Sequence, residues 1–222
     1  MFTLTPPMRQ TTLFGREEPA VDADLGDLTR IPLDEHSWVD HRPGWLRGEE
    51  VVFDELCASL TWGQRRVTMY DQRLPEPRLT AWWVSGDGPE PLPVLGEMRR
   101  VLSRRYGESF DSIGFNWYRD GQDSVAWHGD RHRHVIDDPV VAIVSVGEPR
   151  PFRLRPRRRG PARGFDLGRG DLLVMGGACQ HDWEHCVPKV RATGPRLSIT
   201  YRHGRPLTGT DPTAVRRWAD AD

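Results

Sequence analysis

The feature that most constrains the fold is a series of short strand-like runs in the second half of the chain. From about residue 110 onward, these runs read SIGFNWY, SVAWH, VVAIVSV, PFRLRPR, DLLVMGG and RLSITYR. Turn-forming stretches such as RDGQD, GEPR, RRGPARG and GRGD separate them. Many short strands divided by turns in this way are typical of a β-sandwich or a β-barrel. We therefore expect a β-core from about residue 110 to residue 203.

Two helices are predicted ahead of this core. In residues 48–60, apolar side chains recur at helical spacing, at Val52, Phe53, Leu56 and Leu60. In residues 91–106, the same spacing places Leu95, Met98 and Leu102 on one face, and Gly107 follows as a stop signal. Helices that precede a strand-rich core indicate a mainly β protein of the α+β class.

The remaining segments carry weaker signals. Residues 1–45 are rich in Pro, Gly, Asp and Glu, which favours an extended arm packed on the core. Residues 64–70 have the pattern of a strand, and residues 204–222 have that of a loop followed by a short terminal helix. We therefore expect an arm, one folded domain over residues 46–203, and a tail.

Composition excludes some classes of protein. No apolar run approaches the roughly 18 residues of a membrane-spanning helix, and the first residues lack the basic and apolar segments of a secretory signal. The chain has 3 cysteines, an odd number without framework spacing, which favours a reduced, cytoplasmic protein. A net charge of −1 does not by itself indicate nucleic-acid binding, so any such contact requires a local basic patch.

A candidate metal site begins with His128 and Asp130 at the end of the run SVAWH. Residues two apart on a strand point to the same side, so an imidazole and a carboxylate project together. Two histidines and one carboxylate on one side of a metal leave open positions that suit Fe(II) oxygen chemistry. Such a site needs a second histidine from elsewhere in the chain, and His181 and His185 are the candidates.

These two histidines also fit a different pattern. His181, Glu184 and His185 match the H-x-x-E-H motif of one class of zinc peptidase. That class needs a helix through both histidines and a further protein ligand, usually a glutamate downstream. Pro188 leaves little room for the helix, and no glutamate follows Glu184. We therefore favour a loop that delivers one histidine to His128 and Asp130, although spacing does not choose between the two.

The strand that follows this loop alternates polar and apolar residues. Arg196, Ser198, Thr200 and Arg202 lie on one side, and Leu197, Ile199 and Tyr201 on the other. One interpretation is an ordinary surface strand. The other places the arginines inside a barrel mouth, where a guanidinium clamps the carboxylate of a small anion. Asn116 and Tyr118 likewise share one side of their strand.

Taken together, these motifs resemble the AlkB family of Fe(II)- and 2-oxoglutarate-dependent dioxygenases. The matching stretches are FNWYRDGQDSVAWHGDRHRH, GGACQHDWEHCVPK, the R-x5-R strand and PRLTAWW, and they cover about residues 65–203. The resemblance implies a double-stranded β-helix, or jelly-roll, over about residues 110–203. N-terminal helices would precede it, and a nucleotide-recognition lid would occupy about residues 65–90.

The resemblance also implies roles for individual residues. His128, Asp130 and His185 would hold Fe(II), with His185 chosen because the family's ligand directly precedes x-V-P. The residues expected around the co-substrate 2-oxoglutarate are Asn116, Tyr118, Arg196, Ser198 and Arg202. Among these, Arg196 is expected to bind the distal carboxylate. Ser198 stands where family members usually carry asparagine.

The residues expected to contact the substrate are Tyr70, Arg78, Trp82, Arg131, His132 and Trp183. For Trp82 and Trp83, core packing is the competing interpretation, and we favour it for at least one of them. After the H-x-D motif the family commonly has acidic residues, whereas this chain has Arg131, His132 and Arg133. That change alters which base edge is favoured.

The expected function is oxidative removal of N-alkyl groups from nucleic-acid bases, of the 1-methyladenine and 3-methylcytosine type, in direct-reversal DNA repair. The expected cofactors are Fe(II), 2-oxoglutarate and O2. The expected partner is nucleic acid, first of all alkylated DNA, and the sequence does not choose between single and double strands. The first alternative is the same iron chemistry on RNA, tRNA, a protein side chain or a small molecule. The second is a non-enzymatic nucleic-acid-binding module that uses the basic run over residues 153–164. The chain is expected to be a monomer without membrane contact.

Overall fold

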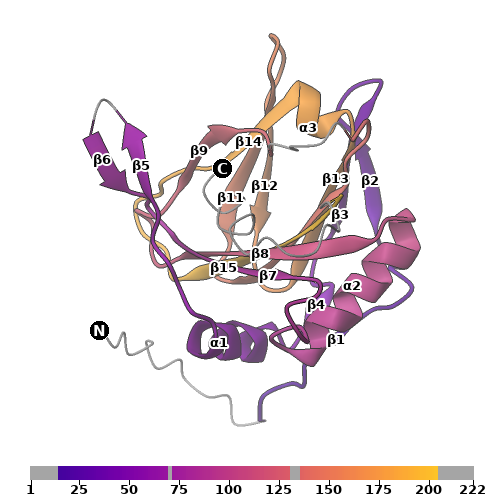
Figure 1. The fold of residues 1–222 in the computed structure, drawn as a ribbon. Coiled ribbons are helices and arrows are strands. Elements are labelled where there is room, and N and C mark those ends of the chain that lie inside the picture. The colour runs from indigo at the N-terminus through magenta and orange to yellow at the C-terminus, as the bar shows by residue number, and fades with distance from the viewer. Residues whose placement is uncertain (1–14, 70–71, 131–135, 205–222) are drawn as a thin grey trace.

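The computed structural model describes residues 15–69, 72–130 and 136–204. Its core consists of two antiparallel sheets that face each other (Figure 1). The larger sheet has the strand order β2-β3-β13-β10-β15-β8-β7, and the smaller has the order β12-β11-β14-β9.

Most core strands that follow each other along the chain lie in different sheets. The strands of the larger sheet here are β8 (Phe110–Tyr118), β10 (Val141–Gly147), β13 (Asp171–Gly177) and β15 (Arg196–His203). Those of the smaller sheet are β9 (Val125–His128), β11 (Arg150–Pro156), β12 (Arg163–Leu167) and β14 (Trp183–Val187). Neighbours within each sheet are therefore mostly distant in sequence, which is the arrangement of a jelly-roll. The expected double-stranded β-helix is confirmed.

Both expected helices are present and cover the outer face of the larger sheet (Figure 1). Helix α1 spans Glu49–Ser59, and helix α2 spans Pro93–Tyr106. Gly107 ends α2 at a positive φ of 73°, a conformation that glycine adopts without the penalty of a Cβ atom. Of the helices in the described segments, none has the length and apolar character needed to cross a membrane.

The helices decide which side of β15 faces the sandwich interior. Leu197, Ile199 and Tyr201 join the buried cluster that includes the apolar faces of α1 and α2. Because successive side chains on a strand point to opposite sides, the polar residues of β15 must then face the smaller sheet. The two arginines of this strand, Arg196 and Arg202, consequently lie inside the sandwich, which rejects the surface-strand interpretation.

The first 45 residues contribute more than an arm. Strands β2 (Thr29–Pro32) and β3 (Ser37–Arg42) extend the larger sheet, with β3 paired to β13. Short strands β1 (Ala20–Val21) and β4 (Leu46–Arg47) pair with each other. An edge of β13 without a partner would expose a row of backbone hydrogen-bonding groups, and β3 satisfies them. The Pro- and Asp-rich composition of this segment hides these strands in the sequence.

The expected lid region contains a separate hairpin and an edge strand. Strands β5 (Arg66–Met69) and β6 (Gln72–Pro75) pair only with each other and project from the body at the left of Figure 1. Strand β7 (Leu79–Val84) follows and forms the edge of the larger sheet beside β8. A short helix, α3 (Cys179–Asp182), connects β13 to β14.

Candidate metal and co-substrate site

Three expected metal ligands meet between the two sheets. His128 ends β9 and Asp130 follows two residues later, while His185 lies on β14 directly opposite His128 in the strand register. One ligand atom from each of the three residues lies within 4.8 Å of the other two. The imidazole centroids of His128 and His185 are 4.3 Å apart. This set of two nitrogens and one carboxylate oxygen suits iron with open coordination positions.

His181 does not join this group. It lies on α3, and its Nε2 is 3.1 Å from the carbonyl oxygen of Ile136. Helix α3 ends at Asp182, and Glu184 and His185 belong to a strand. Glu184 instead forms ion pairs with Arg155 and Arg157. The arrangement therefore excludes the helical zinc site of the H-x-x-E-H pattern.

The protonation states of the three residues fit a divalent metal. Nδ1 of His128 is 2.9 Å from the carbonyl oxygen of Ala126, which can only accept, so Nδ1 donates and Nε2 remains for a metal. Burial, with a further contribution from His128, lowers the pKa of His185 to about 3 and keeps that imidazole neutral. Burial opposes ionisation of Asp130, but Arg202 and the two histidines outweigh it and lower the pKa of that carboxyl. Neutral imidazoles and an ionised carboxylate are the forms that bind metal.

Arg202 forms an ion pair with the carboxylate of Asp130, one of the three candidate metal ligands. Its Nε and Nη2 donate to the two oxygens of Asp130, each over 3.2 Å. Two parallel bonds from a guanidinium fix both the position and the rotation of a carboxylate. Arg202, which the resemblance places around the co-substrate, thus also orients the candidate metal ligand Asp130.

Arg196 offers buried donors to an anion. Its side chain is buried, and Nη2 donates to Oγ of Ser145 over 2.6 Å. Within the described part of the chain, Nε and Nη1 of Arg196 have no hydrogen-bond acceptor. Burial lowers the pKa of Arg196 to about 10, so the group stays charged at neutral pH. Buried donors without partners are costly, and a carboxylate of 2-oxoglutarate would satisfy them.

The other expected co-substrate residues line the same cavity as the three ligands. These are Asn116, Tyr118 and Ser198, with Arg196 and Arg202. On the paired strands β8 and β15, Asn116 lies opposite Ser198 and Tyr118 lies opposite Arg196. The hydroxyl oxygen of Ser198 is 3.2 Å from that of Thr200, so the two share a hydrogen bond.

The lid side of the cavity contains two of the residues expected to contact a substrate. Arg78 donates from Nε to Oδ1 of Asn116 over 3.0 Å, and its Nη2 is 3.5 Å from Oε2 of Glu76. Trp82 lines the cavity, with the guanidinium carbon of Arg202 5.4 Å from its ring centroid. Trp83 points to the other side of β7 and is buried, so core packing is correct for this one of the two tryptophans.

Trp183 corrects one expectation. It is buried in the cluster that contains Val39 and Met175, and its Nε1 donates to Oδ2 of Asp34 over 2.5 Å. It does not line the cavity. Trp183 is the first residue of β14, directly after α3. Residues of β3 and β13 pack against it there, so its ring is buried in the core. Trp183 therefore packs in the core, and among the described residues it is not part of the lining of this cavity.

Three other expected substrate residues, Tyr70, Arg131 and His132, lie outside the described residues. The cavity also has lining residues that sequence reasoning missed. They are Arg65, Thr80, Val125, Ile143, Phe152 and Val187. Strand alternation could have found Ile143, since it shares a side of β10 with Val141 and Ser145, whereas nothing in the local sequence marks Arg65.

The fold and the site define a class: a jelly-roll with a His-Asp-His site and two arginines that line the same cavity, as in 2-oxoglutarate-dependent dioxygenases. The family profile described as the 2OG-Fe(II) oxygenase superfamily matches residues 33–202. The chain belongs to this superfamily and, within it, to the AlkB family. The cofactors of the class are Fe(II), 2-oxoglutarate and O2, in agreement with the expectation.

Individual relatives support this placement. The chain is 33% identical to the mouse (Mus musculus) "Alpha-ketoglutarate-dependent dioxygenase alkB homolog 3", over 72% of this chain and 64% of that protein. It is 30% identical to "DNA oxidative demethylase ALKBH2" of Arabidopsis thaliana, over 68% of this chain and 60% of that protein. The chain thus spans less than two thirds of the length of these relatives. The solved structure titled "The structure of OsALKBH1" has the same fold, with a TM-score of 0.55 and 16% identity, covering 79% of this chain and 100% of that one.

Proposed function

We propose that this protein is an oxidative demethylase that removes N-alkyl groups from nucleic-acid bases, of the 1-methyladenine and 3-methylcytosine type, as direct-reversal DNA repair. The observation that carries the proposal is the joint presence of His128, Asp130 and His185 with the unsatisfied buried donors of Arg196. The similarity to a DNA oxidative demethylase supports the choice of substrate class.

The residues of the chain have distinct tasks in this reaction. His128, Asp130 and His185 would hold Fe(II), while Arg202 keeps the carboxylate of Asp130 in one orientation. Arg196 would bind the distal carboxylate of 2-oxoglutarate. Bound iron, with 2-oxoglutarate and O2, supplies the oxidising power that hydroxylates an N-methyl carbon, and the product loses formaldehyde.

The target base must leave its stack to enter the cavity. Unstacking costs roughly a few kcal/mol and less in single-stranded nucleic acid, which favours a single-stranded substrate. Trp82, which lines the cavity beside Arg202, offers an aromatic surface that would offset this cost. Arg78, which is hydrogen-bonded to Asn116 on the lid side of the cavity, would contact the base.

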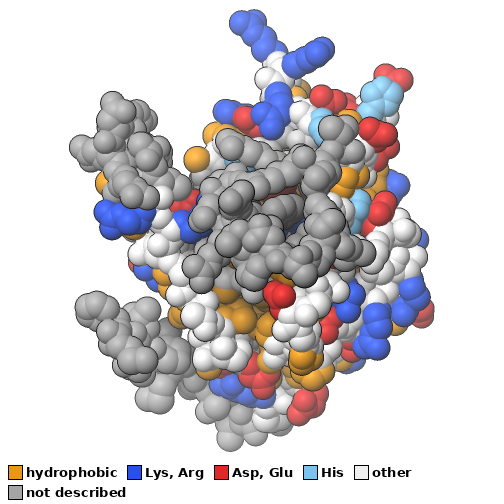
Figure 2. Space-filling model, in the orientation of Figure 1, with side chains coloured by type: hydrophobic (Ala, Val, Ile, Leu, Met, Phe, Trp, Pro, Cys, Tyr) orange, Lys and Arg blue, Asp and Glu red, His pale blue; other side chains and the backbone are white. Residues whose placement is uncertain are grey.

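A basic projection supports contact with phosphates. The connection between β11 and β12 carries Arg157, Arg158 and Arg159, and Figure 2 shows basic side chains at the tip of a projection at the top of the molecule. Arg155 and Arg157 are in ion pairs with Glu184, so Arg158 and Arg159 are the better candidates for phosphate contacts.

The test is formaldehyde release with Fe(II) and 2-oxoglutarate. We expect release from single-stranded oligonucleotides with 1-methyladenine or 3-methylcytosine, and none from the unmethylated oligonucleotide. Methylated tRNA and a lysine-methylated peptide are run in parallel, because the arginine- and histidine-containing segment after Asp130 motivates the alternative substrates. Turnover of tRNA or peptide without turnover of DNA would replace the proposed substrate and keep the iron chemistry.

A non-enzymatic binding module remains the contrasting function. It predicts that His185→Ala leaves every measurable activity unchanged while oligonucleotide binding persists. The enzyme predicts that the same variant keeps oligonucleotide binding and loses formaldehyde release.

A further inference from the structure

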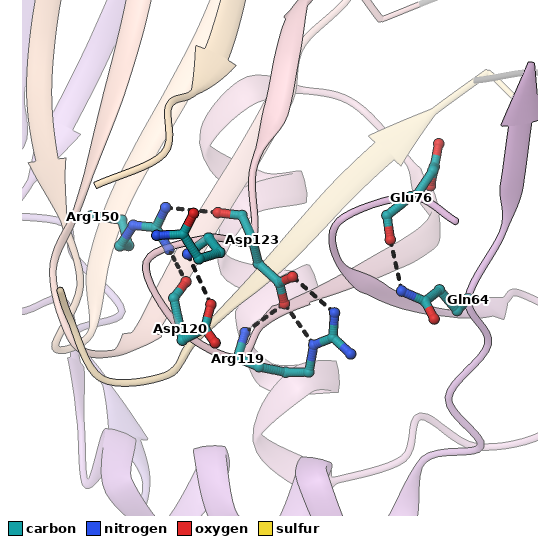
Figure 3. Close-up of polar contacts among 7 residues, drawn as sticks. Gln64, Glu76, Arg119, Asp120, Asp123 and Arg150 are labelled. Atoms are coloured by element: carbon teal, nitrogen blue, oxygen red, sulfur yellow. Dashed lines mark hydrogen bonds and ion pairs between the residues drawn. The ribbon is translucent and has the colours of Figure 1, made fainter. Parts of the chain in front are cut away.

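Arg150 is a buried cation that the proposed reaction does not use. It is the first residue of β11, and its exposed fraction is 0%. Nη1 donates to the carbonyl oxygen of Asp120 over 2.8 Å, and Nη2 donates to those of Asp123 and Pro188 over 2.8 and 2.9 Å (Figure 3). All three acceptors are neutral backbone oxygens. A guanidinium that gives up hydration for carbonyls alone bears a large desolvation cost, which suggests a specific task.

The carboxylate of Asp123, whose backbone oxygen accepts from Arg150, is already engaged. Asp123 accepts hydrogen bonds from the backbone nitrogen, Nε and Nη2 of Arg119, over 2.7 to 2.9 Å (Figure 3). Within the described residues, neither Arg150 nor Arg196 is in an ion pair. Two buried guanidinium groups therefore stand near each other without a paired carboxylate, and Arg150 contributes to lowering the pKa of Arg196.

Tyr118 connects the two cations. The guanidinium carbon of Arg150 is 5.7 Å from the centroid of the Tyr118 ring, and that of Arg196 is 5.3 Å from it. Tyr118 and Arg196 line the cavity, whereas Arg150 does not. Arg150 thus acts on the cavity through the ring of Tyr118, at a distance where a cation and an aromatic ring attract each other.

The same side chain joins two loops that bound the site. Residues 119–124 connect β8 to β9, which ends at His128, and Pro188 directly follows β14, which carries His185. The backbone nitrogen of Val190 also donates to the carbonyl oxygen of Gly121 over 2.9 Å, so the two loops are in contact. Arg150 bonds both of them and contacts Tyr118 at the end of β8.

We propose that Arg150 is a positioning residue for 2-oxoglutarate: it fixes the ring of Tyr118 and adds a second buried positive charge near Arg196. The inference rests on the proposed function in requiring that the co-substrate binds beside these two residues. Arg150 touches neither the cavity nor the metal ligands, so its effect belongs to co-substrate affinity and little to iron affinity.

The test is the dissociation constant of 2-oxoglutarate, measured anaerobically on Fe(II)-loaded full chain from its charge-transfer absorption band. Arg150→Met removes both the hydrogen-bonding guanidinium group and its positive charge, and we expect it to raise this constant about tenfold. Arg150→Lys keeps the positive charge but loses the planar guanidinium group with its several donors, and we expect a rise of about threefold. The dissociation constant of Fe(II) without co-substrate should change by less than about threefold in both variants.

Arg119→Met is the matched control, because Arg119 stabilises the same 119–124 loop through Asp123. In the described part of the chain, the guanidinium groups over the Tyr118 ring are those of Arg150 and Arg196. We expect Arg119→Met to change co-substrate affinity by less than about twofold. An equal rise in Arg119→Met and Arg150→Met would show loop loosening and overturn the inference. Unchanged affinity in folded Arg150→Met would do the same.

Two further readouts separate the possible failures. If Arg150→Met does not fold, as judged by circular dichroism, the Arg150→Lys variant provides the test. An unchanged 2-oxoglutarate affinity in Arg150→Lys would overturn the role of the guanidinium group in fixing Tyr118. If wild-type protein with bound Fe(II) shows no 2-oxoglutarate band, the proposed function itself fails, which is a different result from a wild type and a variant that bind equally well.

Discussion

At the scale of single residues, chemically identical side chains acquire different tasks from their backbone position. His181 and His185 are four residues apart, yet one lies on α3 beside a carbonyl oxygen and the other on β14 opposite His128. Arg196 and Arg202 share one side of β15, yet the first presents buried donors to the cavity and the second holds Asp130. Residue type limits what each group can do, and its surroundings select among those options.

The two histidines give a direct prediction. His185→Ala should abolish the charge-transfer band that forms on anaerobic addition of Fe(II) and 2-oxoglutarate, because one of three protein ligands is lost. His181→Ala should keep the band within about twofold of the wild-type midpoint, since its imidazole is hydrogen-bonded to the carbonyl oxygen of Ile136 and is not part of the His128, Asp130 and His185 group. Equal loss of the band in both variants would refute the assignment of His185 alone.

At the scale of elements, the β11–β12 hairpin has a base fixed by ion pairs and a tip with exposed positive charges. Arg155 and Arg157 fasten its base to Glu184 on β14, and the guanidinium carbon of Arg155 is 4.3 Å from the ring centroid of Trp127. The tip residues Arg158 and Arg159 are exposed. A hairpin held at its base presents charges at a defined place, which costs less entropy on binding than a free loop does.

Removing the tip charges should weaken nucleic-acid binding. The double substitution Arg158→Ala and Arg159→Ala is expected to lower affinity for a single-stranded oligonucleotide about tenfold at low salt. The magnitude of the slope of log affinity against log salt should fall by about 1.4, because about two phosphate contacts are lost and each contributes roughly 0.7 for a single strand. Fluorescence anisotropy over a salt series measures both quantities.

The control for the hairpin is the pair Arg104→Ala and Arg105→Ala, in the exposed last turn of α2. It removes the same charge from another element. An equal loss of affinity in the two double variants would indicate a general charge effect rather than a contact of the hairpin.

At the scale of the whole molecule, distant segments depend on each other. Strand β3 pairs with β13, and its Val39 is fully buried between the sheets. Glu49 at the start of α1 accepts a hydrogen bond from the backbone nitrogen of Gly147 over 2.6 Å, and Trp183 donates to Asp34. The N-terminal strands and the jelly-roll therefore share one core, and we expect them to unfold together.

This dependence can be tested by truncation. A chain that begins at Gly48 lacks β1 to β4. We expect it to be aggregated or to unfold without cooperativity, because β13 loses its partner strand β3 and becomes an exposed edge. In the full chain, Val39→Ala should lower the free energy of unfolding by about 2 kcal/mol while keeping a cooperative transition. A truncated chain with a normal thermal transition would restore the separate arm suggested by composition.

Stability should also fall in acid. Burial alone would raise the pKa of Asp123, but the hydrogen bonds and charge of Arg119 outweigh it, and the folded pKa is lowered. Asp34 and Glu90 show the same direction, each through hydrogen-bond donors that outweigh burial. The unfolded carboxyls, with pKa values of about 4, bind protons first. Their stabilisation is therefore complete above about pH 5 and is lost as pH falls through the unfolded and then the folded values.

Urea unfolding at a series of pH values measures this effect. Asp123→Asn should reduce the free energy of unfolding at pH 7 by roughly 1 kcal/mol. The decrease of that free energy as the pH falls should also be less steep in this variant. If the loss of stability at low pH is unchanged in this variant, the Arg119–Asp123 pair does not contribute to that loss.

Much of the fold and site could be predicted from local patterns. Alternation and turn residues place the strands of the core, and helical spacing with Gly107 places α2. The motifs predict a site of His128, Asp130 and a second histidine, and only the family resemblance favours His185 over His181 as that second histidine. Strands β2 and β3 could not be predicted, because only pairing with β13 makes that polar segment a strand. The role of Trp183 could not be predicted either, since its sequence position beside His185 does not reveal that Asp34 and the core take its ring.

The sequence by itself determined the kinds of groups available: two imidazoles, a carboxylate, and arginines at alternate positions of a strand. Only the tertiary structure decided which side of β15 is the inside, because that depends on where α1 and α2 cover the larger sheet. It also decided the task of Arg150, whose three carbonyl partners and aromatic neighbour come from separate segments of the chain. Backbone periodicity is a local property, whereas burial and partnership depend on packing between segments far apart in sequence.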